Sequence, residues 1–397
     1  MSPLSSNAPH GQSPLRTVQV LGGGNAGSSA HVRSLAEGLV ARGVRVTVCA
    51  PAEADHAYDF AGVGADHVHV PRSSDPVAVA ALRTACANAD LVHAHGLHAS
   101  FRTVLALSGR TTPLVVTWHN RAHAEGPRAH LLRLLERRVM RTAAVVLGTS
   151  PDLVDRARRT GARDARLAAV GLPGRHRTGG LLDADALGPE GSDPFDGHDR
   201  DDPDRLRPKT RAELGATGRP LLIAVGSLER HRGYDVLLDA ARAWRDLEPA
   251  PLVVVAGEGP LRPVLQRRIE DEELPVRLIG HREDVPELLA AADLALLTSS
   301  RESRSVLAQE ALHARVPLVA TRVGGIPDLV GDAAELVPYG DPGALAGTVV
   351  RLLADPERRA VLRERGTRQA ATWPTEDETV AQVLSVYDEL TQPRPLP

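Results

Sequence analysis

Residues 299–317, SSRESRSVLAQEALHARVP, place two carboxylates, Glu302 and Glu310, eight residues apart at the junction between a loop and a helix. Residues 293–298, DLALLT, precede them as a short apolar run with the length and flanks of a buried parallel strand. Residues 306–314 then predict a helix. A strand, a loop and a helix in this order form the repeating unit of an open α/β sheet, and we expect a doubly wound parallel sheet.

The start of the expected helix suits an anion. Its core-facing residues are expected to be Val306, Ala308, Ala311 and Leu312. Because the first N–H groups of a helix lack partners, those near Ser305, Val306 and Leu307 can bind a phosphate. Glu302 falls at the carboxyl end of the strand, where open sheets bind ligands. Two hydroxyl-accepting carboxylates beside a phosphate site predict a sugar-nucleotide; the alternative is two solvated surface charges.

The same stretch resembles the signature of the retaining glycosyltransferases of family 4. That family carries two glutamates at this spacing, then Ala and later Val-Pro, as in Glu310, Ala311, Val316 and Pro317 here. The resemblance implies that Glu302 contacts hydroxyls of the donor sugar and that Glu310 contacts the ribose of the nucleotide. It also implies the GT-B fold, in which two Rossmann-like domains face each other across a cleft.

Composition and charge are those of a globular protein with two domains. The chain has 397 residues, 42% of them hydrophobic and 24% charged. Residues 1–172 contain 19 arginines against 12 acidic residues, although the whole chain has a net charge of −3. A basic first half suits a phosphorylated or membrane-surface acceptor. We expect no nucleic-acid partner.

The chain divides into five expected segments. They are a disordered N-terminus over 1–16, an acceptor-binding domain over 17–172, a flexible Gly/Pro/Asp-rich linker over 173–208, a nucleotide-sugar-binding domain over 209–374 and a helix over 375–390. Thr375 and Glu378 form a capping box for that helix, which the resemblance takes back to the first domain. Cys49 and Cys86 are expected to be buried thiols rather than a disulfide.

No targeting segment or membrane span is expected. No run reaches the roughly 20 apolar residues that cross a bilayer. Residues 1–16 lack the apolar core of a signal peptide. We therefore expect a cytoplasmic protein, with peripheral contact to the inner face of the membrane as an option.

A glycine-rich loop, residues 22–27 (GGGNAG), joins the first expected strand to a helix. Three of its glycines match the dinucleotide fingerprint, namely Gly22, Gly24 and Gly27. That fingerprint needs an acid at the end of the second strand, but residues 44–50 (VRVTVCA) end in Cys and Ala, which disfavours an NAD-dependent oxidoreductase. The resemblance instead assigns Gly27, and His31 four residues later, to the donor phosphates or the acceptor.

Histidines gather where the next expected strand ends, in DLVHAHGLH over residues 90–98. Alternation places His93 and His95 on one face, and His98 follows the turn, a pattern typical of some metal sites. No carboxylate or fourth ligand is evident, so we expect no bound metal. The family commonly has a histidine-rich strand end here, which favours a cleft-lining role for His95 and His98 on the acceptor side.

Residues 114–118 predict another strand that ends in Trp118, followed by His119 and Asn120. The resemblance places His119 near the reacting sugar carbon, with Trp118 and Asn120 on the acceptor side. The alternative is that His119 is a surface histidine that happens to follow a strand.

The second half restarts with a strand over 220–225 and the loop GSLERHRG over 226–233. The family has Gly-Arg and then Lys-Gly here, two cations that hold the diphosphate. Gly226 is followed by Ser227 in place of the arginine, and Arg232 takes the lysine position. Arg230 is a candidate replacement for the missing cation because a guanidinium binds phosphate in a bidentate way. The alternative is that both arginines are exposed loop charges.

Further expected strand ends complete the predicted donor site. Gly257 opens a GEGP turn that resembles the family's Gly-Asp-Gly-Pro, and His281 and Arg282 fall where the family's loop reads the base. After Glu302 and Ser303, the chain has Arg304 and Ser305 where the family often has an aromatic residue and glycine. The residues expected to bind the donor here are Gly226, Gly257, His281, Arg282, Ser303, Arg304, Ser305, Val306, Leu307 and Glu310.

Residues 128–141, RAHLLRLLERRVMR, predict a basic amphipathic helix. Such a helix can lie on an anionic membrane, which makes it a candidate for peripheral membrane contact. The simpler interpretation, which we favour, is that the leucines pack against the domain while the arginines face water.

These observations predict a retaining transfer from a nucleoside diphosphate sugar to an unidentified acceptor hydroxyl. Arg230, Arg232 and the helix start would stabilise the leaving diphosphate without a metal or cofactor. Glu302 would orient the sugar, and no protein base is assigned. Two alternatives remain. One is an epimerase or phosphorylase on the same fold; a phosphorylase is disfavoured because it would need a lysine for pyridoxal phosphate, and the only lysine, Lys209, lies at the edge of the expected linker. The other is a sugar-nucleotide-binding protein that has lost turnover. The donor base, the sugar, the acceptor and the oligomeric state are not indicated.

Overall fold

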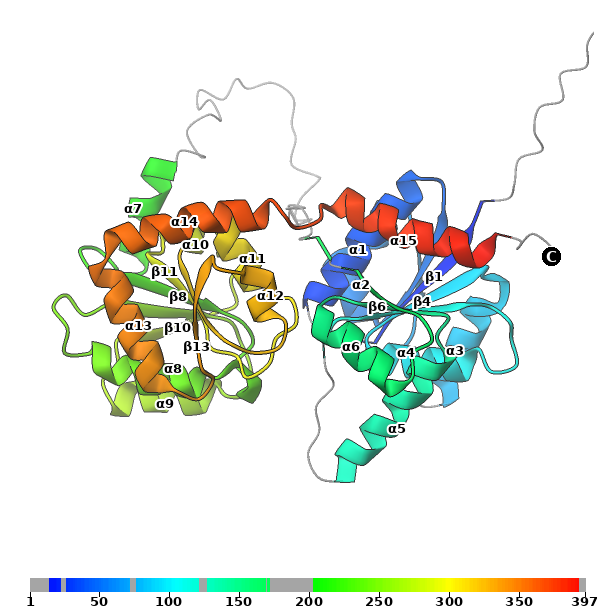
Figure 1. The fold of residues 1–397 in the computed structure, drawn as a ribbon, viewed down its shortest axis with the longest axis horizontal. Helices are drawn as coiled ribbons and strands as arrows, with labels where there is room; N and C mark the ends of the chain where they lie inside the picture. The colour runs from blue at the N-terminus through cyan, green and yellow to red at the C-terminus, as the bar shows by residue number, and fades with distance from the viewer. Residues whose placement is uncertain are drawn as a thin grey trace, which may run out of the picture. The chain divides into compact units, whose positions relative to one another are not determined.

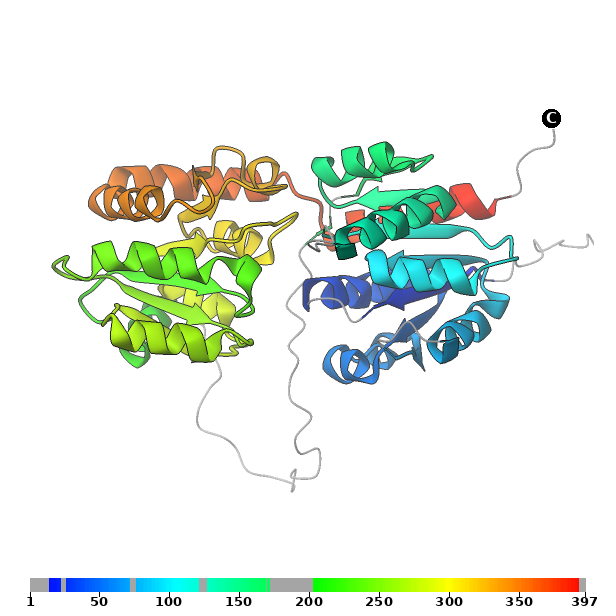
Figure 2. The same ribbon diagram turned by 90° about the horizontal axis from the view of Figure 1, so that it is seen from below.

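The computed structural model describes residues 14–22, 26–71, 76–120, 127–168, 170–171 and 203–392. The chain folds as two compact units. Unit 1 takes the chain up to Thr149, then Leu153–His176, and again from Pro374 onward; unit 2 takes Ser150–Asp152 and Arg177–Trp373. Each unit has its own parallel sheet with helices on both faces, as Figures 1 and 2 show.

Unit 1 is built on a seven-stranded parallel sheet in the order β3-β2-β1-β4-β5-β6-β7. Its strands are β1 (Arg16–Leu21), β2 (Arg45–Ala50), β3 (Asp66–His69), β4 (Leu91–His95), β5 (Leu114–Trp118), β6 (Val145–Gly148) and β7 (Ala165–Leu167). Its helices are α1 (Ala26–Ala41), α2 (Ala52–Tyr58), α3 (Pro76–Ala85), α4 (Leu97–Ala106), α5 (Pro127–Thr142), α6 (Pro151–Thr160) and α15 (Glu376–Thr391), with 3₁₀ turns η1 (Ala61–Val63) and η2 (Cys86–Asn88).

The central strands of unit 1 are buried on both faces, which explains their continuous apolar composition. One face packs against α3, α4, α5 and α6 through residues such as Leu82, Val104 and Leu153. The other packs against α1 and α15 through residues such as Leu35 and Val383. Two separate cores therefore hold one sheet between them.

Unit 2 repeats the plan with six parallel strands in the order β10-β9-β8-β11-β12-β13. Its strands are β8 (Leu221–Val225), β9 (Leu252–Ala256), β10 (Val276–Gly280), β11 (Leu294–Leu297), β12 (Leu318–Thr321) and β13 (Ala334–Val337). Its helices are α7 (Pro203–Glu213), α8 (Tyr234–Ala241), α9 (Arg262–Asp271), α10 (Val285–Ala291), α11 (Val306–His313), α12 (Ile326–Val330), α13 (Pro342–Ala354) and α14 (Pro356–Ala370), with η3 (Arg230–Arg232) and η4 (Arg242–Trp244).

The two faces of this sheet are again covered by different helices. Residues such as Leu288, Leu312 and Ile326 join α10, α11 and α12 to one face. Residues such as Leu237 and Leu345 join α8 and α13 to the other. The prediction of a doubly wound parallel sheet is therefore confirmed for each unit.

The last helix returns to unit 1 after unit 2 is complete. Helix α15 begins with the predicted capping box, in which Thr375 Oγ1 accepts a hydrogen bond from the N–H of Glu378 and the Glu378 carboxylate accepts one from the N–H of Thr375. The helix then packs against α1 in unit 1, as Figure 1 shows. Buried Val380, Val383 and Tyr387 close the core on that face of the sheet.

One expected boundary is wrong. Helix α7 begins at Pro203, inside the segment 173–208 that composition assigned to a linker. Arg207 and Arg211 both form ion pairs with Asp293, and these long-range contacts anchor a helix that its own composition does not predict. The rest of that segment up to residue 202, the glycines and asparagine at 23–25, and residues 1–13 lie outside the described residues.

Two further expectations concern cysteines and membrane spans. Cys49 and Cys86 are both free and buried, as predicted. Burial raises the pKa of the Cys86 thiol to about 11, so it stays protonated. Among the described residues, no helix combines the length and the apolar composition that crossing a bilayer requires.

Candidate functional site

The loops that carry the predicted donor residues leave the sheet of unit 2 at its switch point. The chain runs outward from β8 to β9 and β10 on one side, and from β11 to β12 and β13 on the other. Loops after β8 and β11 therefore diverge at the carboxyl end of neighbouring strands, which is where open α/β sheets bind ligands. Gly226 follows β8, and the segment Ser299–Glu302 follows β11.

Arg232 and Glu302 meet across this switch point. Nη1 of Arg232 lies 2.5 Å from Oε1 of Glu302, and Ser299 Oγ donates a hydrogen bond to the same oxygen at 2.9 Å. The Glu302 side chain is only 11% exposed. Burial raises the pKa of Glu302, and the positive charge of Arg232 opposes that rise. Two residues predicted to bind different parts of a donor thus form an ion pair with each other.

Hydrogen bonds to two backbone carbonyls join the two loops. Thr298 Oγ1 donates to the carbonyl of Arg232 at 2.8 Å, and the N–H of Ser300 donates to the carbonyl of His231, also at 2.8 Å. Gly233 ends the 3₁₀ turn with φ +67°, and a Cβ there would lie 2.1 Å from the carbonyl oxygen of Thr298. Only glycine satisfies both the conformation and the close approach.

Two further glycines, Gly324 and Gly325, support the Glu302 loop from the other side. Gly324 has φ +51°, and a Cβ on it would lie 1.9 Å from the carbonyl oxygen of Glu302. The N–H of Gly325 donates to that same oxygen at 3.0 Å. The position of Glu302 is therefore fixed by backbone on both sides, before any ligand binds.

Helix α11 starts where the sequence predicts it. Ser305 is the N-cap, and its Oγ accepts a hydrogen bond from the N–H of Ala308 at 3.3 Å. The expected core face is wrong for Val306, whose side chain is 39% exposed, because the neighbouring Leu307 is the buried residue. Glu310 is half-buried one turn into the helix.

The remaining cations of the predicted donor site differ in accessibility. Arg304 is half-buried, with its guanidinium 5.5 Å from the centroid of the Trp373 ring, and burial lowers its pKa to about 10. Arg230 is exposed at the start of η3. Arg282 is held by Asp284, with 2.6 Å between Nε and Oδ1, while His281 is exposed beside it.

Gly226 and Gly257 lie at the ends of neighbouring strands β8 and β9. A Cβ on Gly257, which has φ +150°, would lie 2.0 Å from the carbonyl oxygen of Gly226. A Cβ on Gly226 would lie 3.2 Å from Nε of Arg232. The absence of a side chain on Gly226 leaves room for the Arg232 guanidinium. Within the described residues, the buried Nε of Arg232 has no hydrogen-bond partner.

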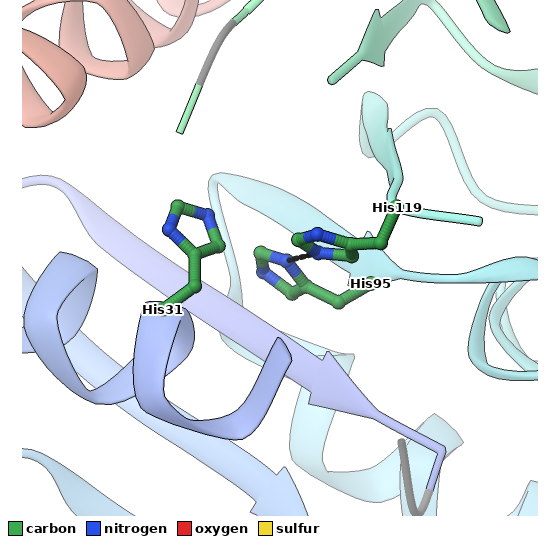
Figure 3. Close-up of side chains that lie close together, drawn as sticks. All are labelled: His31, His95 and His119. Atoms are coloured by element: carbon green, nitrogen blue, oxygen red, sulfur yellow. Dashed lines mark hydrogen bonds between the residues drawn. The ribbon is translucent and has the colours of Figure 1, made fainter. Parts of the chain in front are cut away.

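Unit 1 gathers a second cluster at its own switch point, between β1 and β4. Figure 3 shows His31 on α1, His95 at the end of β4 and His119 just after β5, with their rings close together. Nε2 of His119 lies 3.5 Å from Nδ1 of His95, and one ligand atom from each of the three rings falls within 4.8 Å of the others. Burial is the main cause of the low pKa values, about 4 for His119 and well below the ordinary value for His31 and His95.

A buried hydrogen-bond network lies under this cluster. His95 Nε2 pairs with Oε1 of Gln19 at 3.0 Å, and Nε2 of Gln19 donates to the hydroxyl of Tyr387 at 3.0 Å. That hydroxyl pairs with Nδ1 of His93 at 2.7 Å, and Nε2 of His93 pairs with Oγ1 of Thr117 at 2.7 Å. The network links strands β1, β4 and β5 to the last helix.

The structure corrects several sequence expectations in unit 1. Trp118 is fully buried in the core, so the expectation that it contacts an acceptor is wrong. His98 is exposed on α4 and takes no part in the histidine cluster, which contains His31 and His119 in its place. Gly27 lies in the first turn of α1 rather than in the loop before it. Asn120 is exposed, next to His119.

Sequence reasoning missed the residues that orient the others. Gln19 is a polar residue in the apolar strand TVQVL, and a buried polar side chain in such a position requires partners, which is the signal that was available. Tyr387 gives no comparable signal, because its partners lie more than 290 positions away.

Comparison with known protein families finds a matching family model in each unit. Residues 207–369 match the family model "Glycosyl transferases group 1", and residues 26–173 match "Glycosyl transferase 4-like domain". Similar proteins include an alpha-D-kanosaminyltransferase of Streptomyces kanamyceticus, 31% identical over 270 residues that cover 64% of this chain and 63% of that protein. A D-inositol 3-phosphate glycosyltransferase of Salinispora arenicola is 35% identical over 204 residues, 47% of this chain and 45% of that one. The chain thus spans from about half to under two thirds of the length of these relatives.

Solved structures show the same fold. A structure of HepE from Anabaena in complex with UDP has a TM-score of 0.75 and 18% sequence identity, covering 94% of this chain and 100% of that one. WaaG, a glycosyltransferase involved in lipopolysaccharide biosynthesis, has a TM-score of 0.67 and 17% identity, covering 94% of this chain and 99% of that one. At this level of identity, the likeness concerns the fold alone.

Proposed function

Because this chain belongs to the glycosyl transferases group 1, with a glycosyl transferase 4-like domain ahead of that domain, we propose that it transfers a sugar from a nucleoside diphosphate sugar to an acceptor hydroxyl. The transfer proceeds with retention at the anomeric carbon. Unit 2 binds the donor, and unit 1 provides the acceptor side. The observation that carries this proposal is the Arg232–Glu302 pair at the switch point of unit 2, beside the start of α11.

The groups of unit 2 match the parts of such a donor. The guanidinium of Arg232 and the first N–H groups of α11 take the negative charge of the leaving diphosphate, so that no metal ion is needed for that task. Glu302 accepts hydrogen bonds from sugar hydroxyls, and Glu310 accepts them from the ribose. Arg230 is the candidate for a second phosphate contact, since it is exposed and Ser227 is uncharged.

Histidines of unit 1 serve the acceptor side in this proposal. His119 follows β5 and is half-buried. Its low pKa keeps the imidazole uncharged at neutral pH, and an uncharged ring can accept or donate a hydrogen bond at a sugar hydroxyl. His31 and His95 lie beside it.

Calorimetry with UDP, GDP and ADP and with their common sugar conjugates tests the donor site. We expect one diphosphate to bind selectively, and Glu310→Ala to weaken that binding about tenfold through loss of a ribose hydrogen bond. Glu357→Ala is the matched control, because Glu357 is an exposed acid in the first turn of α14. Binding of no diphosphate would refute the proposed donor site.

Turnover separates an enzyme from a protein that only binds. Release of free diphosphate in the presence of candidate acceptors measures transfer, and the anomeric configuration of the isolated product measures retention. Selective diphosphate binding without transfer to any acceptor or to water would favour a sugar-nucleotide-binding protein. An inverted product would refute the retaining mechanism while leaving the donor site intact.

We propose, in addition, that α5 brings the protein to an anionic membrane surface from the cytoplasmic side. Leu131 and Leu134 are 57% and 64% exposed, and Arg138 and Arg141 are exposed at the following helical spacings on the same face. The sequence analysis favoured leucines that pack against the domain, whereas Leu131 and Leu134 are exposed. The acid of the helix, Glu136, is buried and paired with Arg156 at 2.7 Å, so it does not offset the basic face.

Sedimentation with lipid vesicles tests the membrane contact. We expect the protein to sediment with vesicles that contain an anionic lipid, but not with purely zwitterionic ones, and to be released as salt increases. Leu131→Asp combined with Leu134→Asp should abolish sedimentation. Val77→Asp is the matched control, because Val77 is 72% exposed on α3 of the same unit. Equal sedimentation of both variants would refute a role for α5.

A further inference from the structure

We propose that His31, His95 and His119 bind a single divalent transition-metal ion at the switch point of the sheet in unit 1. The proposal concerns unit 1 alone and does not depend on the donor chemistry proposed for unit 2. It departs from the sequence expectation of no bound metal, and the His119 nitrogen that binds the ion would then not contact a sugar hydroxyl directly. It differs from the spacing pattern in the sequence, in which His93, His95 and His98 looked like the candidate ligands. Only His95 belongs to both sets, because His98 is exposed on α4 and the two ring nitrogens of His93 pair with Tyr387 and Thr117.

The distances between the rings suit one ion. Zinc binds imidazole nitrogens at about 2.0–2.1 Å, so two ligands of a tetrahedral site lie roughly 3.4 Å apart. Nε2 of His119 and Nδ1 of His95 are already 3.5 Å apart. His31 contributes a ligand atom within 4.8 Å of the other two, and Figure 3 shows its ring beside theirs.

The hydrogen bond beneath His95 prepares it as a ligand. Its Nε2 lies 3.0 Å from Oε1 of Gln19, an oxygen that only accepts, so this nitrogen carries the hydrogen. The orientation of the Gln19 amide is fixed in turn, because its Nε2 donates to the hydroxyl of Tyr387. The other ring nitrogen of His95, Nδ1, therefore presents its lone pair toward His119. Metal-binding histidines almost always have such a partner on the nitrogen that faces away from the metal.

The donor set selects the class of ion. Three imidazoles without a carboxylate favour zinc, cobalt, nickel or copper over magnesium and calcium, which prefer oxygen ligands. The ligands come from three separate elements of one folded core, a helix, a strand end and the residue after a second strand. Three protein ligands leave a fourth position open to an oxygen from water or from a hydroxyl.

A cobalt titration of the chain, prepared without a histidine tag and stripped with chelator, tests the proposal. We expect one Co²⁺ per chain, with the visible absorption bands of a four-coordinate ion, and displacement of that ion by one equivalent of Zn²⁺. His31→Ala and His119→Ala should each weaken Co²⁺ binding about 100-fold and remove the bands. Gln19→Met should weaken binding about 10- to 100-fold, as loss of a partner behind a metal ligand does.

Two controls exclude other histidines. His98→Ala changes an exposed histidine next to β4, and His67→Ala changes one that pairs with Asp55; both should bind Co²⁺ as the wild type does. Circular dichroism shows which variants fold, and the half-buried His119 decides the result if the buried positions do not tolerate substitution. Absence of stoichiometric binding, or binding that survives His119→Ala in a folded protein, would overturn the proposal.

Discussion

Arg232 and Glu302 lie 70 positions apart in the chain and form an ion pair 2.5 Å long between the loops that follow β8 and β11. Each was predicted separately as a ligand for a donor molecule. The two opposite charges therefore balance each other in this pair. In the proposed donor complex, the diphosphate would share the Arg232 guanidinium with Glu302; the buried Nε of that guanidinium has no hydrogen-bond partner among the described residues.

Substitution of Arg232 should separate binding from stability. Arg232→Ala removes a charged hydrogen-bond donor, so we expect diphosphate affinity to fall about 10- to 100-fold, as measured by calorimetry. It also leaves the buried Glu302 without its cation, which should lower the free energy of unfolding by about 1–3 kcal/mol. In the double variant Arg232→Ala with Glu302→Gln, stability should recover while diphosphate binding does not. Recovery of both, or of neither, would contradict the pairing.

Substitution of Gly324 should disturb the Glu302 loop. Gly324→Ala places a methyl group 1.9 Å from the carbonyl oxygen of Glu302, at a residue with φ +51°. Gly340→Ala is the matched control, because Gly340 has φ +77° but no atom within 4 Å of its Cβ position. We expect the control to lose about 1 kcal/mol through backbone strain alone and Gly324→Ala to lose about 2–4 kcal/mol together with diphosphate binding. Urea unfolding and calorimetry measure the two effects; equal losses would disprove the close contact.

Substitution of Tyr387 should destabilise unit 1. Tyr387→Phe leaves the amide of Gln19 and the ring nitrogen of His93 without their common partner in a fully buried place. Unsatisfied buried groups of this kind cost about 1–3 kcal/mol. The control Tyr339→Phe, at a side chain that is 43% exposed, should stay within about 0.5 kcal/mol of the wild type. If urea unfolding resolves two transitions, only the one that belongs to unit 1 should shift.

The stability of unit 2 should depend on the ionisation of Glu272. Hydrogen bonds from Arg242 and Arg268 lower the pKa of this carboxyl from its ordinary value of 4.5 to about 2. A lowered pKa in the folded state means that the carboxylate stabilises the fold above pH 4.5 and loses this effect as the pH falls from 4.5 toward 2. Thermal unfolding of Glu272→Gln should therefore show a small decrease in Tm at pH 7 that vanishes toward pH 2 and shrinks in high salt. A difference independent of pH would exclude this mechanism.

The central strands were predictable from the sequence because they are buried on both faces. The continuous apolar run of β5 placed this strand at its observed bounds, Leu114–Trp118, and all five of its residues are buried. The edge strand β3, Asp66–His69, was missed because its residues are half-buried or exposed and only one of them, Val68, is apolar. Helix α7 was missed because its anchors, the ion pairs to Asp293, depend on residues about 80 positions away.

The loops that carry Arg232 and Glu302 follow β8 and β11, as the sequence predicts, but the contacts between these loops were not foreseen. A motif shows which loop carries Arg232 or Glu302, since each follows a recognisable strand. It does not show that the two side chains pair, because that depends on the hydrogen bonds and glycine contacts that bring two strand ends together. In unit 1, spacing suggested His98 as a companion of His95, whereas the fold supplied His31 and His119 from elements that lie far away in sequence.

The return of α15 to unit 1 makes unit 2 an insertion within the sequence of unit 1. The ribosome makes α15 only after all of unit 2. Until then, the core that contains Leu35 lacks the residues that α15 contributes, such as Val383. During synthesis, unit 2 would then complete its fold before unit 1, although most of unit 1 is made first. A gene cut after residue 173 would encode every strand of unit 1 yet leave the helical cover of one face of its sheet incomplete.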